Sequence, residues 1–277
     1  IIAGKILGKK TIVLFRSSGK GSDLATSHKS LRGIFRMALL KRWADRFIVL
    51  TQDMQDEVIS AGYKSDRVIR MYNGVDTDHY APLQSKKHLS DELTPKDKTI
   101  LLYVGRLHPI KNVPLLLKSL QKALIQCPNL FLIIVGDGEE KETLLNLTAE
   151  LNLQSSVKFV GFKPDALECL QAADIFVLPS LTEGISNSLL EAMSCGLACI
   201  ATDVGASREI LGDGNCGVLV KSDDVNEFSN AIVRLASDKS AVEKFSELAR
   251  HRVINQYSLN AVGESYIKLY HEILIDQ

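Results

Sequence analysis

Short apolar runs recur along the chain of 277 residues, and stretches with helical periodicity separate most of them. From residue 99 onward these runs are continuous rather than alternating, which suits strands that are buried on both faces. Six such runs occupy 99–104, 130–135, 157–160, 174–178, 198–202 and 217–220. The pattern predicts an α/β domain built on a parallel, doubly wound, six-stranded Rossmann-like sheet.

The first 72 residues carry a shorter version of the same alternation. Apolar runs at 11–15, 45–50 and 67–72 alternate with helical patterns, so this stretch predicts a βαβαβ unit with few strands. A sheet of that size buries too little apolar surface to be stable alone. We therefore expect this segment to be looser than the larger sheet that follows it.

Two signals divide the chain into parts. Asn73 and Gly74 form a strong turn signal. From about residue 224 a purely helical pattern replaces the alternation of strands and helices, and it ends in a helix at 258–275 with an apolar stripe. We predict three parts, with the boundaries 1–75, 76–255 and 256–277.

The charge of the chain is distributed unevenly, although its formal net charge is zero. Residues 1–50 contain eleven Lys and Arg side chains against two Asp side chains, a balance of +9. Part of this charge lies in a basic amphipathic stretch at 31–47. One interpretation is peripheral contact with anionic lipid headgroups. The other, which we favour slightly, is a helix that covers a core and turns Arg32, Arg36 and Arg42 to water.

Cysteines and apolar segments exclude several classes of protein. The five cysteines form no C-x-x-C pair, so neither a disulfide framework nor a zinc site is expected. Reduced thiols in a cytoplasmic protein are the simplest interpretation. No apolar run reaches the roughly 18 residues that a membrane-spanning helix needs. A nicotinamide site at Gly136-Asp137-Gly138 lacks the third glycine and the acidic partner of that motif, and we reject it.

The loop after the run at 99–104 carries the first candidate chemistry. Gly105 allows a sharp turn off the strand, and Asn112 is a good N-cap for the next helix. Lys111 then lies at a helix N-terminus, where the helix dipole disfavours a cation unless an anion binds there. Arg106 can donate to a phosphate oxygen from the same loop. Two solvated surface cations are the alternative.

A second loop and helix follow the run at 174–178. Glu183 precedes this helix and Glu191 lies inside it. The backbone N–H groups between them belong to Gly184, Ile185, Ser186, Asn187 and Ser188. N–H groups at a helix N-terminus suit a diphosphate, and the two carboxylates suit sugar hydroxyls. Structural roles stay open as well, because Ser188 and Glu191 have the spacing of a capping box.

A series of segments in order, rather than one motif, resembles glycosyltransferase family 4. The series includes YNGVDTDHY, YVGRLHPIKNVPLLLKSL, IIVGDGEEKETL and ADIFVLPSLTEGISNSLLEAMSCGLACIATDVGASREIL, and it extends from about residue 11 to the end. The resemblance implies the two-domain GT-B fold and a retaining transfer of sugar from a nucleotide diphosphate to a hydroxyl acceptor. Its last helix would cross back to the N-terminal domain.

The resemblance also implies a role for each matching residue. Arg106 and Lys111 would bind the donor diphosphate, and Glu183 would face the transferred sugar. Glu191 would hold the ribose hydroxyls. The remaining donor-binding positions would be Gly105, Gly161, Phe162, Gly184, Ile185, Ser186, Asn187 and Ser188, with Gly161 and Phe162 near the base. No metal or other cofactor is expected, since the two cations would replace magnesium.

The chain departs from the family pattern at its N-terminal side. Only the last part of the acceptor-side domain is recognisable, within residues 1–72. A truncated module that binds a nucleotide sugar without catalysis is therefore the alternative function. The pyridoxal phosphate lysine of phosphorylases and the acidic and histidine residues of sugar-nucleotide epimerases are not evident. The expected partners are a nucleotide sugar and a glycan, lipid or small-molecule acceptor, and not nucleic acid.

Overall fold

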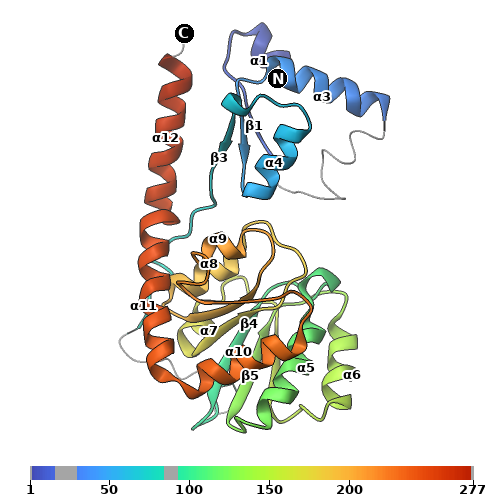
Figure 1. The fold of residues 1–277 in the computed structure, drawn as a ribbon, viewed down its shortest axis with the longest axis vertical. Coiled ribbons are helices and arrows are strands. Elements are labelled where there is room, and N and C mark those ends of the chain that lie inside the picture. The colour runs from blue at the N-terminus through green and yellow to red at the C-terminus, as the bar shows by residue number, and fades with distance from the viewer. Residues whose placement is uncertain (1, 16–29, 84–92, 276–277) are drawn as a thin grey trace. The chain divides into compact units, whose positions relative to one another are not determined.

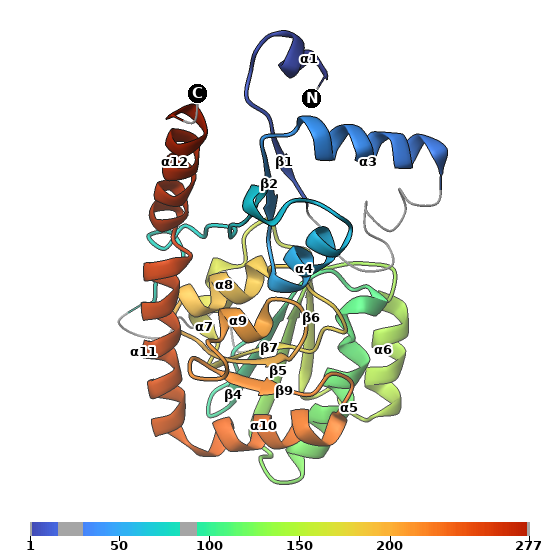
Figure 2. The same cartoon turned by 45° about the horizontal axis from the view of Figure 1, so that its top comes forward.

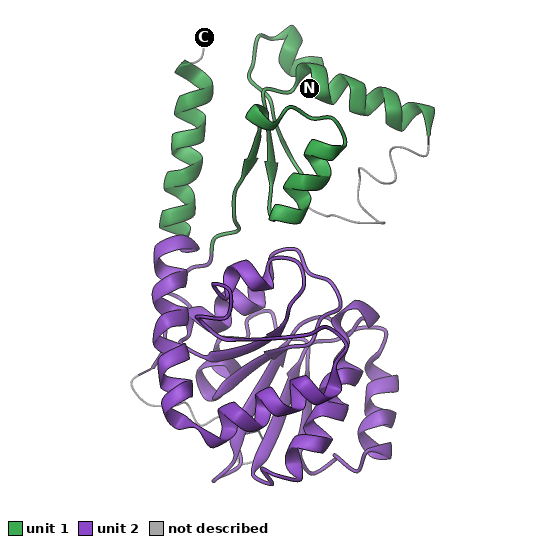
Figure 3. Ribbon diagram, in the orientation of Figure 1, with its two compact units in different colours: residues 1–74, 259–277 green, residues 75–258 purple. Residues whose placement is uncertain are grey.

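The computed structural model describes residues 2–15, 30–83 and 93–275 (Figure 1). These residues form two compact units, which Figure 3 shows in different colours. Unit 1 comprises residues 1–74 and 259–277, and unit 2 comprises residues 75–258. Each unit has a parallel sheet of its own. The boundaries lie one to three residues from those predicted from the sequence.

Unit 2 contains the predicted six-stranded parallel sheet, in the order β6-β5-β4-β7-β8-β9. Its strands are β4 (Thr99–Val104), β5 (Leu130–Val135), β6 (Val157–Gly161), β7 (Ile175–Leu178), β8 (Ala198–Thr202) and β9 (Val218–Val220). All six coincide with the continuous apolar runs to within one residue. Every residue of β5, β7 and β8 is buried, as expected for strands covered on both faces.

Helices connect these strands and cover the sheet (Figure 2). They are α5 (Val113–Leu124), α6 (Lys141–Glu150), α7 (Leu167–Ala172), α8 (Asn187–Ser194), α9 (Ser207–Ile210), α10 (Val225–Ser237) and α11 (Lys239–Gln256). Helices α5 and α10 pack together, and their Leu116 and Phe228 join a core cluster with Leu101 of β4. Helices α8 and α11 also pack together, and both contact β8. The helical C-terminal pattern from residue 224 is confirmed.

Unit 1 has a three-stranded parallel sheet in the order β1-β2-β3. The strands are β1 (Ile12–Leu14), β2 (Arg46–Val49) and β3 (Val68–Arg70), and the helices are α1 (Ile2–Ile6), α3 (Leu31–Trp43), α4 (Gln52–Ser60) and α12 (Leu259–Ile275). Asp45 joins β1 to β2, because its carboxylate accepts hydrogen bonds from the Thr11 N–H (2.7 Å) and hydroxyl (3.1 Å).

In unit 1 the C-terminal helix α12 packs against the β-sheet formed by the N-terminal segment. Leu269 and Ile273 of α12 form a buried cluster with Ile48 of β2 and Met71, which follows β3. A separate set of rings lies around Phe47, whose ring centroid is 4.7 Å from that of Tyr63. Among the helices of the described residues, none is long and apolar enough to cross a membrane.

Candidate functional site

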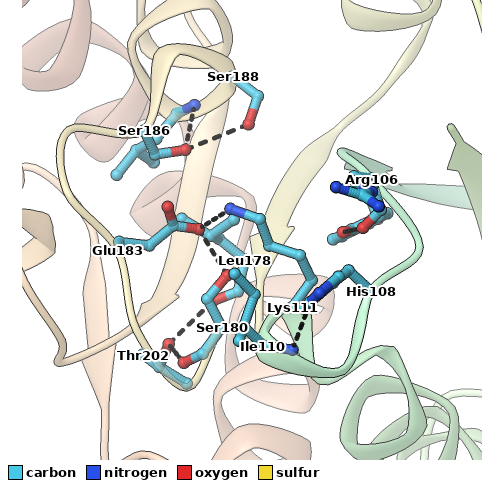
Figure 4. Close-up of polar contacts among 12 residues, drawn as sticks. Arg106, His108, Ile110, Lys111, Leu178, Ser180, Glu183, Ser186, Ser188 and Thr202 are labelled. Carbon is cyan, nitrogen blue, oxygen red and sulfur yellow. Dashed lines mark hydrogen bonds and ion pairs between the residues drawn. The ribbon is translucent and has the colours of Figure 1, made fainter. Parts of the chain in front are cut away.

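Two loops at the carboxyl ends of neighbouring strands bring the predicted residues Lys111 and Glu183 together (Figure 4). The Lys111 Nζ atom, after β4, donates to Oε1 of Glu183, after β7, at 2.6 Å. The Ser180 hydroxyl donates to the same oxygen at 2.6 Å. The Glu183 side chain is only 7% exposed, so this carboxylate is held by two donors in a nearly dry environment.

The loop that carries Glu183 is fixed by contacts that the sequence pattern did not reveal. The buried Thr202 hydroxyl donates to the backbone carbonyl of Ser180 at 2.5 Å. Gly205, at φ +53°, lies so close that an added Cβ would be 1.9 Å from the Glu183 carbonyl oxygen. The neighbouring Ala206 N–H donates to the Gly184 carbonyl at 3.2 Å. A residue other than glycine at 205 would therefore displace the backbone of Glu183.

Helix α8 begins after this loop, and the residue that caps it differs from the expectation. Ser186 is the N-cap, and its hydroxyl accepts from the Leu189 N–H at 3.4 Å and lies 3.2 Å from the Ser188 hydroxyl. The alternative in which Ser188 and Glu191 form a capping box is wrong, because Ser188 already lies inside the helix. The sequence has Ser186, Asn187 and Ser188 in a row, and the spacing to Glu191 made Ser188 the alternative that the structure contradicts.

Glu191 is consequently a helix residue without a capping role. It is partly buried, and burial raises the pKa of its carboxyl group. The negative charge of Asp165 raises this pKa further, and nearby His79 lowers it in part. His79 pairs with Asp165 at 2.7 Å between Nε2 and Oδ2, outside the residues that sequence reasoning had selected. The environment of Glu191 thus differs from that of Glu183, which has a cation directly beside it.

The loop after β4 presents its two cations in different ways. Arg106 is 67% exposed, and its guanidinium lies 3.7 Å from the Glu139 carboxylate. Its backbone carbonyl accepts from the hydroxyl of Tyr103 at 3.1 Å. Tyr103 is fully buried, and burial raises the pKa of its phenol, so the hydroxyl stays a donor. Arg106 thus presents an exposed guanidinium on a backbone that is anchored by Tyr103.

The turn between Lys111 and α5 also departs from the expectation. Lys111 is the last residue of a short 3-10 turn, Pro109–Lys111. It therefore precedes α5 and is not part of the first turn of that helix. Asn112 occupies the N-cap position of α5, but it adopts a left-handed conformation and its side chain does not cap. The Asn112 side-chain amide instead donates to Asp223 at 3.2 Å. This connection ties the loop to the segment after β9.

A pocket of about 430 Å³ lies beside Arg106, at the ends of β4, β5 and β6. It is lined by Val104, Gly105, Arg106, Val135, Gly136, Asp137, Gly138, Phe162 and Lys163. A Cβ at Gly136 would lie 1.8 Å from the Gly105 carbonyl oxygen, so only glycine allows this approach. Gly161, at φ +81°, turns the chain at the end of β6, and the Phe162 side chain after it is 72% exposed. Sequence reasoning missed Gly136 as a structural part of the site.

The described residues contain no group of three or more His, Cys, Asp or Glu side chains that could hold a metal ion. All five cysteines are free and buried.

Comparison with known families assigns the chain. The sequence pattern of the family described as "Glycosyl transferases group 1" matches residues 84–252, and that of "Glycosyltransferase Family 4" matches residues 2–79. The first match alone covers more than half of the chain. This chain belongs to the group 1 glycosyl transferases. The family resemblance inferred from the sequence is therefore confirmed.

Curated relatives of this group 1 glycosyl transferase are themselves transferases or synthases. The UDP-Gal:alpha-D-GlcNAc-diphosphoundecaprenol alpha-1,3-galactosyltransferase of Escherichia coli is 29% identical over 262 residues, 91% of this chain and 67% of that protein. The N-acetyl-alpha-D-glucosaminyl L-malate synthase of Bacillus anthracis is 24% identical over 275 residues, 99% of this chain and 71% of that protein.

Solved structures agree on the fold. A crystal structure of Anabaena Alr3699/HepE in complex with UDP has a TM-score of 0.85 at 21% identity, and covers 98% of this chain and 74% of that chain. The sucrose-phosphate synthase of Thermosynechococcus elongatus has a TM-score of 0.76 at 24% identity, with 100% and 71% covered. The predicted GT-B type α/β fold of the group 1 enzymes is confirmed.

Proposed function

We propose that unit 2 binds a nucleotide-diphosphate sugar, and that the chain transfers the sugar to a hydroxyl acceptor with retention of anomeric configuration. The observation that carries this proposal is the Lys111–Glu183 pair, which joins the loops after β4 and β7 beside the start of α8. A cation, a carboxylate and a helix N-terminus at one sheet edge match the phosphate and hydroxyl groups of such a donor.

Within this proposal each charged group has one task. Lys111 Nζ uses one of its three donor positions for Glu183, so the others can donate to the diphosphate. Exposed Arg106 closes onto the same diphosphate as a second cation. The backbone N–H groups from Gly184 to Ser188 contact the sugar and phosphate, and Glu183 accepts from a sugar hydroxyl. We infer that these two cations make added metal unnecessary for binding.

We assign the nucleoside end of the donor to two further groups. Glu191 would accept hydrogen bonds from the ribose hydroxyls, a role supported by its lack of a capping function. The pocket of about 430 Å³ with exposed Phe162 would receive the base. Its walls carry apolar Val104 and Val135, which suit the faces of a flat ring.

The charge arrangement supports the following transfer step. The bond from the anomeric carbon to the diphosphate oxygen breaks, and the acceptor oxygen bonds to that carbon on the same face. The acceptor proton passes to an oxygen of the leaving diphosphate. Arg106, Lys111 and the helix N-terminus stabilise the charge that develops there. Glu183 is a weak candidate for a covalent nucleophile, because Lys111 and Ser180 both donate to its Oε1. This argument supports retention without a double displacement.

For the acceptor we propose only a chemical class. Relatives in Escherichia coli and Campylobacter jejuni are named for diphosphoundecaprenol or diphospho-undecaprenol substrates, and one in Mycolicibacterium smegmatis is named for phosphatidylinositol monomannoside. These relatives support a lipid-linked or glycan acceptor for this chain. We infer that unit 1 belongs to the acceptor side, and that the protein works in the cytoplasm.

Titration calorimetry with UDP, GDP and ADP in the presence of EDTA tests donor binding. At least one of these nucleotides should bind. Lys111→Met should lower the affinity for that nucleotide about tenfold or more, because a charged hydrogen bond is lost. The matched control is Lys98→Met, since Lys98 is also partly buried but donates to the Pro128 carbonyl at the opposite end of β4. Equal affinity of the two variants, or binding only with added magnesium or manganese, would contradict the proposal.

A non-catalytic nucleotide-sugar-binding module is the second candidate, because the Lys111–Glu183 pair and the pocket beside Phe162 would also serve binding without transfer. Release of nucleotide from each sugar nucleotide, in the presence of candidate acceptors, separates the two functions. Turnover that Lys111→Met abolishes supports the transferase. Tight donor binding with no turnover for any acceptor tested, prenyl diphosphate sugars included, would favour the module.

A further inference from the structure

The chain around Tyr80 packs against the face of α8 that carries Glu191. The buried Ser194 hydroxyl of α8 donates to the backbone carbonyl of Tyr80 at 2.6 Å. Ser194 follows Glu191 by three residues, so both side chains lie on the same face of this helix. Arg250 of α11 donates to the same Tyr80 carbonyl at 3.3 Å. The preceding residue, His79, is therefore held near Glu191.

His79 is paired with a carboxylate from another part of unit 2. Its Nε2 atom lies 2.7 Å from Oδ2 of Asp165, which follows β6. The other oxygen of Asp165 accepts from the Leu167 N–H at 2.9 Å, at the start of α7. The backbone N–H of His79 donates to the Asp76 carboxylate at 3.0 Å. Both side chains of the His79–Asp165 pair are 46% exposed, so the fixed imidazole can still exchange protons with water.

Two charges of opposite sign act on Glu191 from this pair. Burial and the negative charge of Asp165 raise the pKa of the Glu191 carboxyl group, and protonated His79 lowers it in part. An imidazolium beside Asp165 therefore offsets the charge that opposes ionisation of Glu191. A neutral imidazole leaves the charge of Asp165 without this offset.

The other titratable and charged groups on the elements packed against this face keep one charge state near neutral pH. Burial raises the pKa of the Tyr80 phenol to about 12 and that of the Cys195 thiol to about 12, and it also raises the pKa of Cys199 in β8. A backbone hydrogen bond lowers the pKa of Asp165, which stays ionised. Arg250 stays cationic. Histidine, by contrast, is the residue type that ordinarily changes charge between about pH 5 and 8.

We propose that His79 is a positioning residue for nucleotide binding, whose positive charge, held against Asp165, offsets that carboxylate at Glu191 and makes nucleotide affinity depend on pH. The inference rests on the proposed donor site, in which Glu191 accepts from the ribose hydroxyls. His79 acts on Glu191 through charge, since its hydrogen bond is to Asp165. Nucleotide affinity then persists to lower pH than it would with a neutral residue at position 79.

Titration calorimetry of UDP, GDP and ADP at about pH 6 and about pH 8.5, in the presence of EDTA, tests the charge of His79. Each affinity is divided by that of the unaltered chain at the same pH, which cancels protonation of the nucleotide phosphate. His79→Gln keeps a donor for Asp165 but no charge. It should weaken binding about two- to fivefold at the lower pH, the range for half-exposed charge pairs, and not at the higher pH. His79→Lys should restore affinity at the lower pH.

His251→Gln is the matched control, because His251 is an exposed histidine of α11 in the same unit and lies beside Asn255. This variant should bind as the unaltered chain does at both pH values. Equal loss of affinity at both pH values for His79→Gln, no loss at either, or the same loss for His251→Gln would overturn the role of His79. Each of these results would leave the proposed donor site standing.

A double-mutant cycle in the free energy of unfolding tests the same charge without nucleotide. At about pH 6, Glu191→Gln should raise this free energy more in the His79→Gln background than in the unaltered chain, because ionising Glu191 costs more when no imidazolium offsets Asp165. At about pH 8.5 the two gains should be equal. Equal gains at both pH values would overturn the inference. A difference at the lower pH in a chain that binds none of the three nucleotides would support the charge of His79 and contradict the donor site.

Discussion

The two units are built from the same kind of element but differ in how completely these elements are covered. In unit 2 the strands β5, β7 and β8 have no exposed residue, and helices pack against them. In unit 1 the strands have three or four residues, and Leu14 of β1 is 41% exposed. Apolar burial is the main favourable term in folding, so unit 2 should be much the more stable.

The difference also separates what each unit can do. The Lys111–Glu183 pair of unit 2 depends on loops anchored at the ends of a rigid sheet, through Thr202, Tyr103 and Gly205. Such anchoring holds charged groups in place before a ligand arrives. Unit 1 instead exposes apolar and basic side chains on α1 and α3.

Removing the contribution of α12 should have the largest effect. Leu269→Ala with Ile273→Ala deletes two buried side chains, each of which contributes about 2–5 kcal/mol, and this should unfold unit 1. Trp43 is the only tryptophan of the chain and lies in unit 1, so its fluorescence reports this unit alone. The Trp43 fluorescence of the variant in buffer should resemble that of the unfolded chain. The unfolding curve followed by far-ultraviolet circular dichroism should still show the cooperative transition of unit 2.

The matched control is Leu116→Ala with Leu120→Ala in α5, which deletes two fully buried leucines from unit 2. This variant should lower the denaturant midpoint seen by circular dichroism while the Trp43 signal stays native in buffer. If both variants shifted both signals equally, the two units would fold as one and the comparison would fail.

A methyl group at Gly205 should have the next largest effect, confined to unit 2. Gly205→Ala places a Cβ 1.9 Å from the Glu183 carbonyl oxygen and should cost about 3 kcal/mol or more, with loss of nucleotide binding. Gly214→Ala is the control, because Gly214 also has positive φ (+88°) but its nearest contact would be 3.9 Å away. It should cost about 1 kcal/mol and leave affinity unchanged. Comparable losses in both variants would mean that backbone strain, rather than the Glu183 contact, decides.

The smallest effect concerns Glu191 and depends on pH. Its folded-state pKa is raised by burial and by Asp165, so the native state favours the protonated form. This contribution to stability is complete below the unfolded-state pKa and is lost as pH rises through the folded-state pKa. Glu191→Gln should therefore raise the free energy of unfolding at pH 7, and change it hardly at all below about pH 4.

If Glu191 also holds ribose, the same variant should weaken nucleotide binding at pH 7 about tenfold, because a charged acceptor is lost. Stability would then rise while affinity falls. A variant with unchanged affinity would return Glu191 to a purely structural role.

The sequence predicted the strands well because burial on both faces leaves a long apolar run, such as 130–135, that matches β5. It also selected Lys111 and Glu183, since cations and carboxylates beyond strand ends are visible as residue types. It failed where geometry decides among similar residues, as with Ser186 against Ser188 at the start of α8. Anchors such as Tyr103 and Thr202 looked like ordinary strand residues, because only the folded loops give their hydroxyls acceptors.

The exposure of the apolar residues of α3 was the other property that the pattern of apolar and polar positions could not predict. Leu31 and Phe35 fit an amphipathic helix, and periodicity does not say whether its apolar side faces a core, a partner or water. The answer depends on how much protein surrounds α3 in unit 1.

Amide hydrogen exchange with and without the nucleotide that binds in calorimetry, in the presence of EDTA, tests the central claim most directly. Without nucleotide, residues 99–104 and 130–135 should exchange far more slowly than residues 12–14, because β4 and β5 lie in the buried core of unit 2, whereas Leu14 of β1 is 41% exposed. The nucleotide should then slow exchange at 105–112 and 183–188 and leave unit 1 unchanged. Equal protection of these strands, or no change at these loops with saturating UDP, GDP and ADP in turn, would contradict a stable donor-binding unit 2.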